Sequence, residues 1–111
     1  MSEDSAEEMR GKAKAIERIA VELRAEAISE GGAVRVVAGA ADSIWELDLR
    51  LNAFELSGVE LGELIVETIK DANRKAGAEM AEQAGQIMGR EISPESFDGT
   101  PERIEREEEQ R

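Results

Sequence analysis

The sequence contains neither cysteine nor histidine among its 111 residues. The lack of cysteine excludes a disulfide framework and a thiolate metal site. The lack of histidine removes the commonest general base and the commonest metal ligand. No nucleotide-binding fingerprint or metal-binding motif is present, and no two carboxylates stand out as an acid–base pair. We therefore predict that the protein is not an enzyme and that it needs no cofactor and no metal ion.

Aromatic residues are also scarce, with one tryptophan, two phenylalanines and no tyrosine. This composition predicts a small hydrophobic core, for which self-association is a common remedy. No apolar run is long enough to span a membrane, and the N-terminus lacks the basic and then apolar pattern of a signal peptide. We expect a soluble, cytoplasmic protein.

Acidic residues dominate, with 26 against 14 basic ones and a formal net charge of −12. The two ends hold most of this charge. Residues 1–8 carry four acidic and no basic side chains, and residues 91–111 carry eight acidic and three basic ones. An acidic protein is a poor partner for nucleic acid, because basic residues must replace the counterions of the phosphates. This exclusion is weak for residues 9–90, which hold only three of the net negative charges.

A first helix is predicted from about residue 6 to residue 24, where alanine-rich sequence favours helix. Apolar residues recur in it at spacings of four and three, which places them on one face that packs against the sheet or a partner helix. These residues are Met9, Ala13, Ile16, Ala20 and Leu23.

Three short strands are predicted next, over residues 25–29, 33–38 and 43–51, with glycine-containing turns between them. The short connections make neighbouring strands antiparallel. In the third strand Trp45, Leu47 and Leu49 alternate with charged residues. A period of two puts the apolar set on one face of the sheet, so Trp45 is expected in the core.

A second helix is predicted from about residue 58 to residue 88. Ser57 and Glu60 have the spacing of a capping box at its start. At about 1.5 Å per residue this helix would be roughly 45 Å long, which is more than a small sheet can cover. Its second half is therefore expected to project, fray or meet another subunit. The result is a two-layer α+β fold in the order α-β-β-β-α, with a three-stranded antiparallel sheet and one apolar sheet face covered by both helices.

The segment "GGAVRVVAGAADSIWELDLRLNAFELSGVELGELIVETIKDANRKA" resembles the YbaB/EbfC family of bacterial nucleoid-associated proteins. The shared pattern is a glycine before a valine-rich strand, a second strand of alternating apolar and charged residues, and then a long helix. The resemblance covers about residues 7–90. It implies a homodimer with projecting helices, located with the nucleoid, that binds DNA without strong sequence preference and has no enzymatic activity. The domain would then span residues 6–90, between a disordered acidic lead of residues 1–5 and an acidic, disordered tail of residues 91–111.

Basic residues on both helices are the candidate DNA contacts. Arg10, Lys14 and Arg18 follow one another at four-residue spacing and would contact phosphates without reading bases. Without the resemblance, a solvated helix face is the simpler interpretation, with Arg18 paired to Glu22. Intrahelical partners Glu67 and Asp71 weaken the case for the second helix. The subsidiary candidates are Lys12, Arg24, Lys70, Arg74 and Lys75.

A second function stays open on the same fold. The acidic surface would bind basic protein partners, and the projecting half of the second helix would offer an apolar face for docking, with no DNA binding at all.

Overall fold

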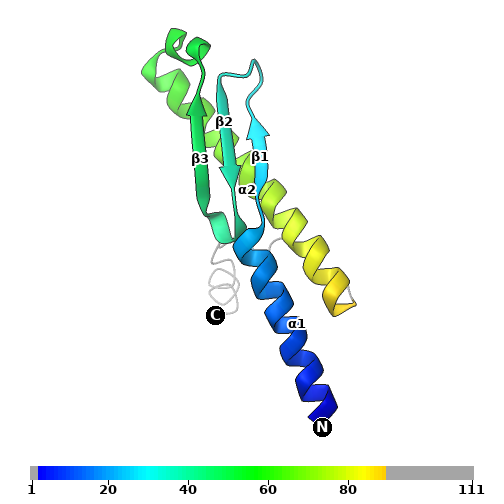
Figure 1. Cartoon of the computed structure of the whole chain (residues 1–111). Coiled ribbons are helices and arrows are strands. Elements are labelled where there is room, and N and C mark those ends of the chain that lie inside the picture. Colours follow the sequence, from blue (N-terminus) through cyan, green and yellow to red (C-terminus); the bar gives the residue numbers. More distant parts are fainter. Residues whose placement is uncertain (1–2, 90–111) are drawn as a thin grey trace, which may run out of the picture.

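The computed structural model of the chain describes residues 3–89, and the expected acidic tail of residues 91–111 lies outside them. The order of elements is α-β-β-β-α, as predicted, with two additional 3-10 turns (Figure 1). The first helix begins at Glu3, three residues before its predicted start. The elements are α1 (Glu3–Glu22), β1 (Ala25–Ile28), β2 (Val34–Ala38), η1 (Ala40–Asp42), β3 (Ile44–Leu49), η2 (Leu51–Glu55) and α2 (Gly58–Met88).

The three strands form one antiparallel sheet in the order β1-β2-β3. The turn between β1 and β2 contains Gly31 and Gly32, both with positive φ, at 86° and 79°. Glycine adopts this left-handed conformation without a steric penalty, and the turn brings β2 back beside β1. The strand register is the basis for assigning the two sheet faces.

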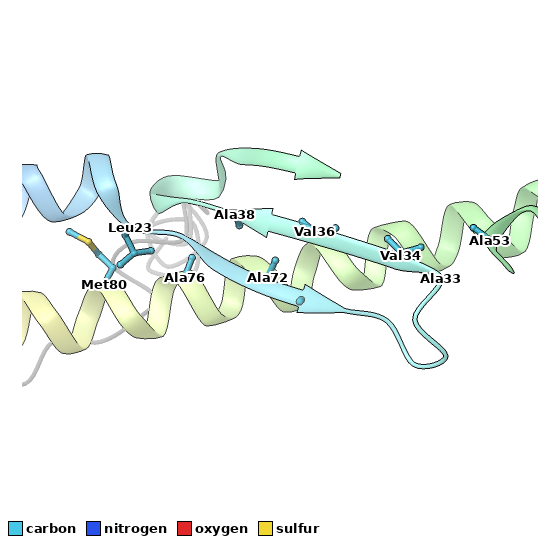
Figure 2. Close-up of a cluster of buried hydrophobic side chains, with 10 residues drawn as sticks. Leu23, Ala33, Val34, Val36, Ala38, Ala53, Ala72, Ala76 and Met80 are labelled. Carbon is cyan, nitrogen blue, oxygen red and sulfur yellow. The ribbon is translucent and has the colours of Figure 1, made fainter. Parts of the chain in front are cut away.

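One face of the sheet packs on α2. Val36 pairs with Ala27 of β1 and with Leu47 of β3, so these three side chains share a face. The helix α2 crosses β1 and β2 on that face (Figure 1). Figure 2 shows the core between them, and six of its ten residues are alanine, which confirms the predicted small core. The core residues are Leu23, Ala27, Ala33, Val34, Val36, Ala38, Ala53, Ala72, Ala76 and Met80.

The predicted capping box begins α2. The Ser57 hydroxyl accepts a hydrogen bond from the Glu60 amide at 3.1 Å, and the Glu60 carboxylate accepts one from the Ser57 amide at 2.9 Å. Gly89 ends the helix in the left-handed conformation, and its amide donates to the Gly85 carbonyl at 2.7 Å. Both ends therefore satisfy backbone groups that a helix terminus would otherwise leave unpaired.

The helix α1 packs chiefly against α2 and not over the sheet, which differs from the expected arrangement of two helices on one sheet face. Ile16, Ile19 and Ala20 are partly buried there, close to Met80 of α2. The second half of α2 thus finds its partner within the same chain. Met9, predicted on the packed stripe, is half-exposed, so only the second half of α1 is held by packing. Both helices extend beyond the sheet at its lower end in Figure 1.

The third strand corrects the prediction that Trp45 belongs to the core. Trp45 is 55% exposed, and the remaining five residues of β3 are all exposed as well. The pairing of β2 with β3 shifts between Val37 and Ala38, so that Val37 faces Glu46 and Ala38 faces Ile44. Trp45 is the extra residue of this β-bulge, and a bulge re-aims the side chain it carries. Alternation alone could not place it.

Candidate nucleic-acid interface

The basic ladder of α1 points away from the protein core. Arg10, Lys14 and Arg18 are all exposed. Lys14 and the partly buried Ile16 are two residues apart, which is about 200° around a helix. The four-residue spacing keeps the three cations on the solvent side, opposite the face that packs on α2.

The cations of this ladder form no ion pair with a side chain of residues 5–89. In particular, the expected pairing of Arg18 with Glu22 is not formed. Lys12 is different, because it is partly buried and lies two residues from both Arg10 and Lys14, toward the packed side of α1. An unpaired cation on an exposed helix can exchange its water and counterions for a phosphate. The ladder of three is thus the available cationic surface on α1.

Arg24 is already occupied by its own chain. Its guanidinium donates to the carbonyls of Val21 at 3.0 Å and Leu23 at 2.8 Å, and so caps the C-terminal end of α1. It also lies 3.6 Å from the centroid of the Trp45 ring, in a cation–π contact. No local pattern marks this pair, because the two residues are far apart in the chain and meet only through the β-bulge.

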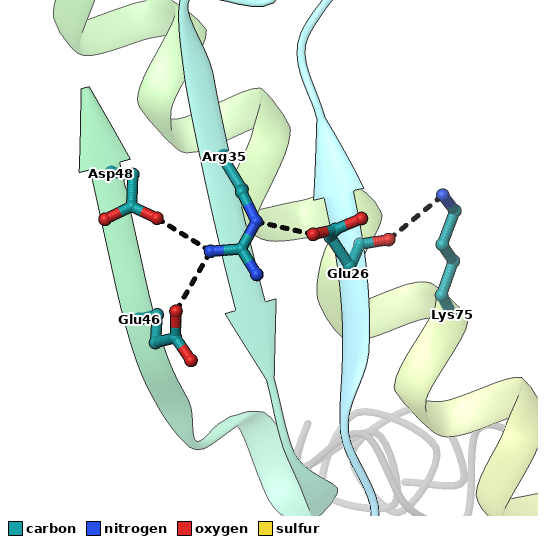
Figure 3. Close-up of polar contacts among 5 residues, drawn as sticks. All are labelled: Glu26, Arg35, Glu46, Asp48 and Lys75. Atoms are coloured by element: carbon teal, nitrogen blue, oxygen red, sulfur yellow. Dashed lines mark hydrogen bonds and ion pairs between the residues drawn. The ribbon is translucent and has the colours of Figure 1, made fainter. Parts of the chain in front are cut away.

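Two of the three candidate cations on α2 also have partners. Arg74 forms an ion pair with Asp71, as the three-residue spacing predicted. Lys75 does not pair with Asp71, and instead donates from Nζ to the Glu26 carbonyl of β1 at 3.2 Å (Figure 3). Lys70 is exposed and has no ion-pair partner among the described residues. The cations of α2 therefore do not form a second free ladder.

The sheet face opposite α2 is acidic. Arg35 binds three carboxylates, Glu26 at 2.5 Å, Glu46 at 2.9 Å and Asp48 at 2.7 Å (Figure 3). The hydrogen bonds that the Arg35 guanidinium donates to Glu46, Glu26 and Asp48 raise its pKa above the ordinary value. One cation against three anions leaves a negative surface, so this face would repel phosphate. Alternating charges on the strands hinted at the cluster, but its members could be identified only from the register.

Other kinds of site find little support in residues 3–89. No cluster of acidic side chains there could hold a metal ion. An open groove on the first turns of α2 is lined by two glycines, two valines, Glu63 and Glu67, and it offers carboxylates to a ligand but no cation. Neither described helix combines the length and apolar character of a membrane span. The α1 ladder is thus the surface best suited to bind a polyanion.

Comparison with known proteins identifies the family of the chain. No curated protein shows significant similarity to the chain. The profile of the YbaB/EbfC DNA-binding family, however, matches residues 2–91, which is most of the sequence and includes both helices and the whole sheet. The match and the α-β-β-β-α order together confirm the resemblance seen in the sequence. The chain belongs to the YbaB/EbfC DNA-binding family.

Proposed function

We propose that the protein binds duplex DNA in the nucleoid, weakly and without strong sequence preference, as a homodimer. The observation that carries this proposal is the α1 ladder of Arg10, Lys14 and Arg18, exposed, unpaired within the described residues and turned away from the core. Side chains that contact phosphates position a protein on the duplex but do not distinguish bases. Lys12 and Lys70 would add subsidiary contacts. Arg24, Arg74 and Lys75 contribute less, because each is engaged within its own chain.

Two features account for weak binding. Three cations are a small number beside the six to ten phosphate contacts, roughly, of proteins with strong electrostatic binding. The remaining surface is anionic, with a formal net charge of −12 for the chain. The acidic tail of residues 91–111 would compete with phosphate for the same ladder. A second copy of the chain doubles the ladder, and this doubling lets local attraction exceed the repulsion of the whole molecule.

An uncovered apolar surface supports the homodimer. Leu47 and Leu49 of β3 lie on the sheet face that packs on α2. The helix covers only β1 and β2, so the Leu47 and Leu49 side chains remain 46% and 37% exposed. Lys75 of α2 extends toward β1, where it contacts the Glu26 carbonyl. Val66 precedes Lys75 by nine residues, or two and a half helical turns, so the Val66 side chain extends from the opposite side of α2, toward β3. We define the β3–α2 seam as Leu47, Leu49, Leu51, Phe54, Val59 and Val66, all exposed large apolar residues.

A buried polar atom on the same flank of α2 points to a partner. The Oδ1 atom of Asn73 is buried and has no hydrogen-bond partner among the described residues. Asn73 follows Val66 by two turns, so it lies on the same flank of the helix. A buried acceptor without a donor is unfavourable by about 1–3 kcal/mol. A second chain in the β3–α2 seam could supply the donor and cover the apolar side chains together.

Fluorescence anisotropy with a labelled duplex tests the DNA proposal. The samples are the wild-type chain, an Arg10/Lys14/Arg18→Ala variant, and an Arg103/Arg106/Arg111→Ala variant that loses the same number of cations from the tail. At low salt, about 50 mM, we expect the wild type and the tail variant to bind and the ladder variant to lose most of its affinity. At about 200 mM salt the wild-type affinity should fall steeply.

Two results would contradict the proposal. If the ladder and tail variants weaken binding equally, net charge and not the ladder controls it. If the wild type shows no binding to any duplex at low salt, the fold serves protein–protein contacts, as in the alternative function.

A further inference from the structure

The C-terminal end of α1, which we call its base, is joined to the sheet by contacts between three separate segments of the chain. Only Leu23 and Arg24 connect α1 to β1. Arg24 stacks on Trp45 of β3, and Trp45 in turn lies against Gly39, which follows β2. A Cβ atom at Gly39 would lie 2.4 Å from Nε1 of Trp45, so only glycine leaves room for the indole in this position. The end of α1 is thus tied to the far strand of the sheet.

The backbone just before Trp45 and at Trp45 has an unusual conformation. The turn before β3 contains Ala41 and Asp42, both with positive φ, at 56° and 61°. Alanine rarely adopts this conformation, which is unfavourable by roughly 1–2 kcal/mol. The β-bulge at Trp45 follows directly. Strained residues and bulges often occur next to functional sites, where they re-aim a side chain. Here both lead to the ring that Arg24 contacts.

We propose that Arg24 and Trp45 form a clamp that fixes the direction in which α1 leaves the sheet. Trp45 is then a positioning residue for the DNA-binding ladder. This inference rests on the proposed role of α1 in DNA binding. The clamp holds α1 through a single guanidinium, which at once caps the last carbonyls of the helix and stacks on the indole.

The geometry of α1 makes its direction important. Arg10 lies 13 residues before Leu23, which is roughly 20 Å along the helix axis. A change of about 10° at the base would therefore move Arg10 by about 3–4 Å, more than the length of a hydrogen bond to a phosphate. Packing on α2 holds the second half of α1 through Ile16, Ile19 and Ala20, whereas Met9 and its neighbours in the first half are exposed. The clamp at the base adds a second constraint on the direction of the unsupported first half.

The direction of α1 can be measured without DNA. The chain contains no cysteine, so Glu8→Cys and Gln86→Cys, both on exposed positions, introduce two specific sites for spin labels. Labelled chains are mixed with an excess of unlabelled ones, and pulsed electron paramagnetic resonance gives the distance distribution between α1 and α2 within one chain. We compare Trp45→Ala, Trp45→Phe and Arg24→Met in this background, with circular dichroism to confirm folding.

We expect Trp45→Ala and Arg24→Met to broaden the distance distribution, and Trp45→Phe, which keeps an aromatic face, to preserve it. In unlabelled protein, Trp45→Ala removes no charge, yet we expect its DNA affinity to fall about threefold to tenfold with an unchanged salt dependence. An unchanged distribution in Trp45→Ala would overturn the clamp. A broadened distribution with unchanged DNA affinity would overturn its positioning role. Wild-type protein that binds no DNA would refute the proposed function, while the distance measurement would still decide the clamp.

Discussion

Truncation of Leu47 to alanine should separate the two chains of the proposed dimer. The change removes three carbon atoms. Their complete burial contributes about 2.4 kcal/mol of hydrophobic free energy, at roughly 0.8 kcal/mol per methylene. Leu47 is 46% exposed in the single chain, so about 1 kcal/mol of that burial would come from a second copy. A two-fold interface contains the substitution twice, which gives about 2 kcal/mol and a roughly 30-fold weaker dimer.

Ile28→Ala is the matched control for this variant. Ile28 is 49% exposed, loses the same three carbon atoms, and pairs with Arg35 on the acidic face of the sheet, away from the β3–α2 seam. The two substitutions should therefore affect the folding of a single chain to a similar extent. Sedimentation equilibrium over a range of concentrations should show the weaker dimer only for Leu47→Ala. Equal dissociation constants for the two variants, or a wild type that is monomeric throughout, would refute the proposed seam.

Three further predictions address the ladder, the core and the capping box. In anisotropy titrations, the Arg10/Lys14/Arg18→Ala variant should show a shallower dependence of the logarithm of the DNA association constant on the logarithm of the salt concentration. The slope should fall in magnitude by about 2.7 for each protomer whose three cations contact phosphate, and an unchanged slope would exclude these contacts. Met80→Ala should lower the free energy of unfolding, measured by urea denaturation, by about 2–5 kcal/mol, because the Met80 side chain of α2 is 2% exposed where α2 meets α1. A loss below about 1 kcal/mol would mean that the two helices are not packed there. Hydrogen bonds from the backbone and side chain of Ser57 lower the pKa of Glu60 below 4.5, so its stabilising effect is present above pH 4.5 and disappears as the pH falls through the lower folded-state pKa. Glu60→Gln keeps the hydrogen-bond acceptor, so the thermal midpoint of this variant should vary less than that of the wild type between about pH 3 and pH 6, and an equal variation would contradict the assignment.

Periodicity was sufficient to predict most of the fold. The bounds of α2 were predicted as observed, and the capping box at its start acts locally and was therefore visible in the sequence. The strands were each located within two residues of their observed ends. The basic ladder of α1 was also visible in the sequence, since its four-residue spacing determines a common helix face. The structure adds that this face is opposite the packed one.

Features that depend on tertiary contacts could not be predicted in this way. Alternation placed Trp45 in the core, but a bulge inserts one residue and changes the direction of the side chain, and no local signal marked the bulge. The early start of α1 at Glu3 was missed because a segment rich in acidic residues was interpreted as disordered. The partner of Lys75 is a backbone carbonyl 49 residues away, which spacing along one helix cannot reveal.

That contact of Lys75 also protects an open border of the sheet. β1 is an edge strand, and such strands present free carbonyls to which a strand of another molecule can add. The Lys75 ammonium occupies the Glu26 carbonyl at this edge, so an incoming strand would first have to displace a charged group. Lysine is among the residues that natural proteins use to prevent such edge-to-edge aggregation. Growth of the sheet into an open polymer is thereby discouraged at β1, and association is left to the opposite side of the molecule.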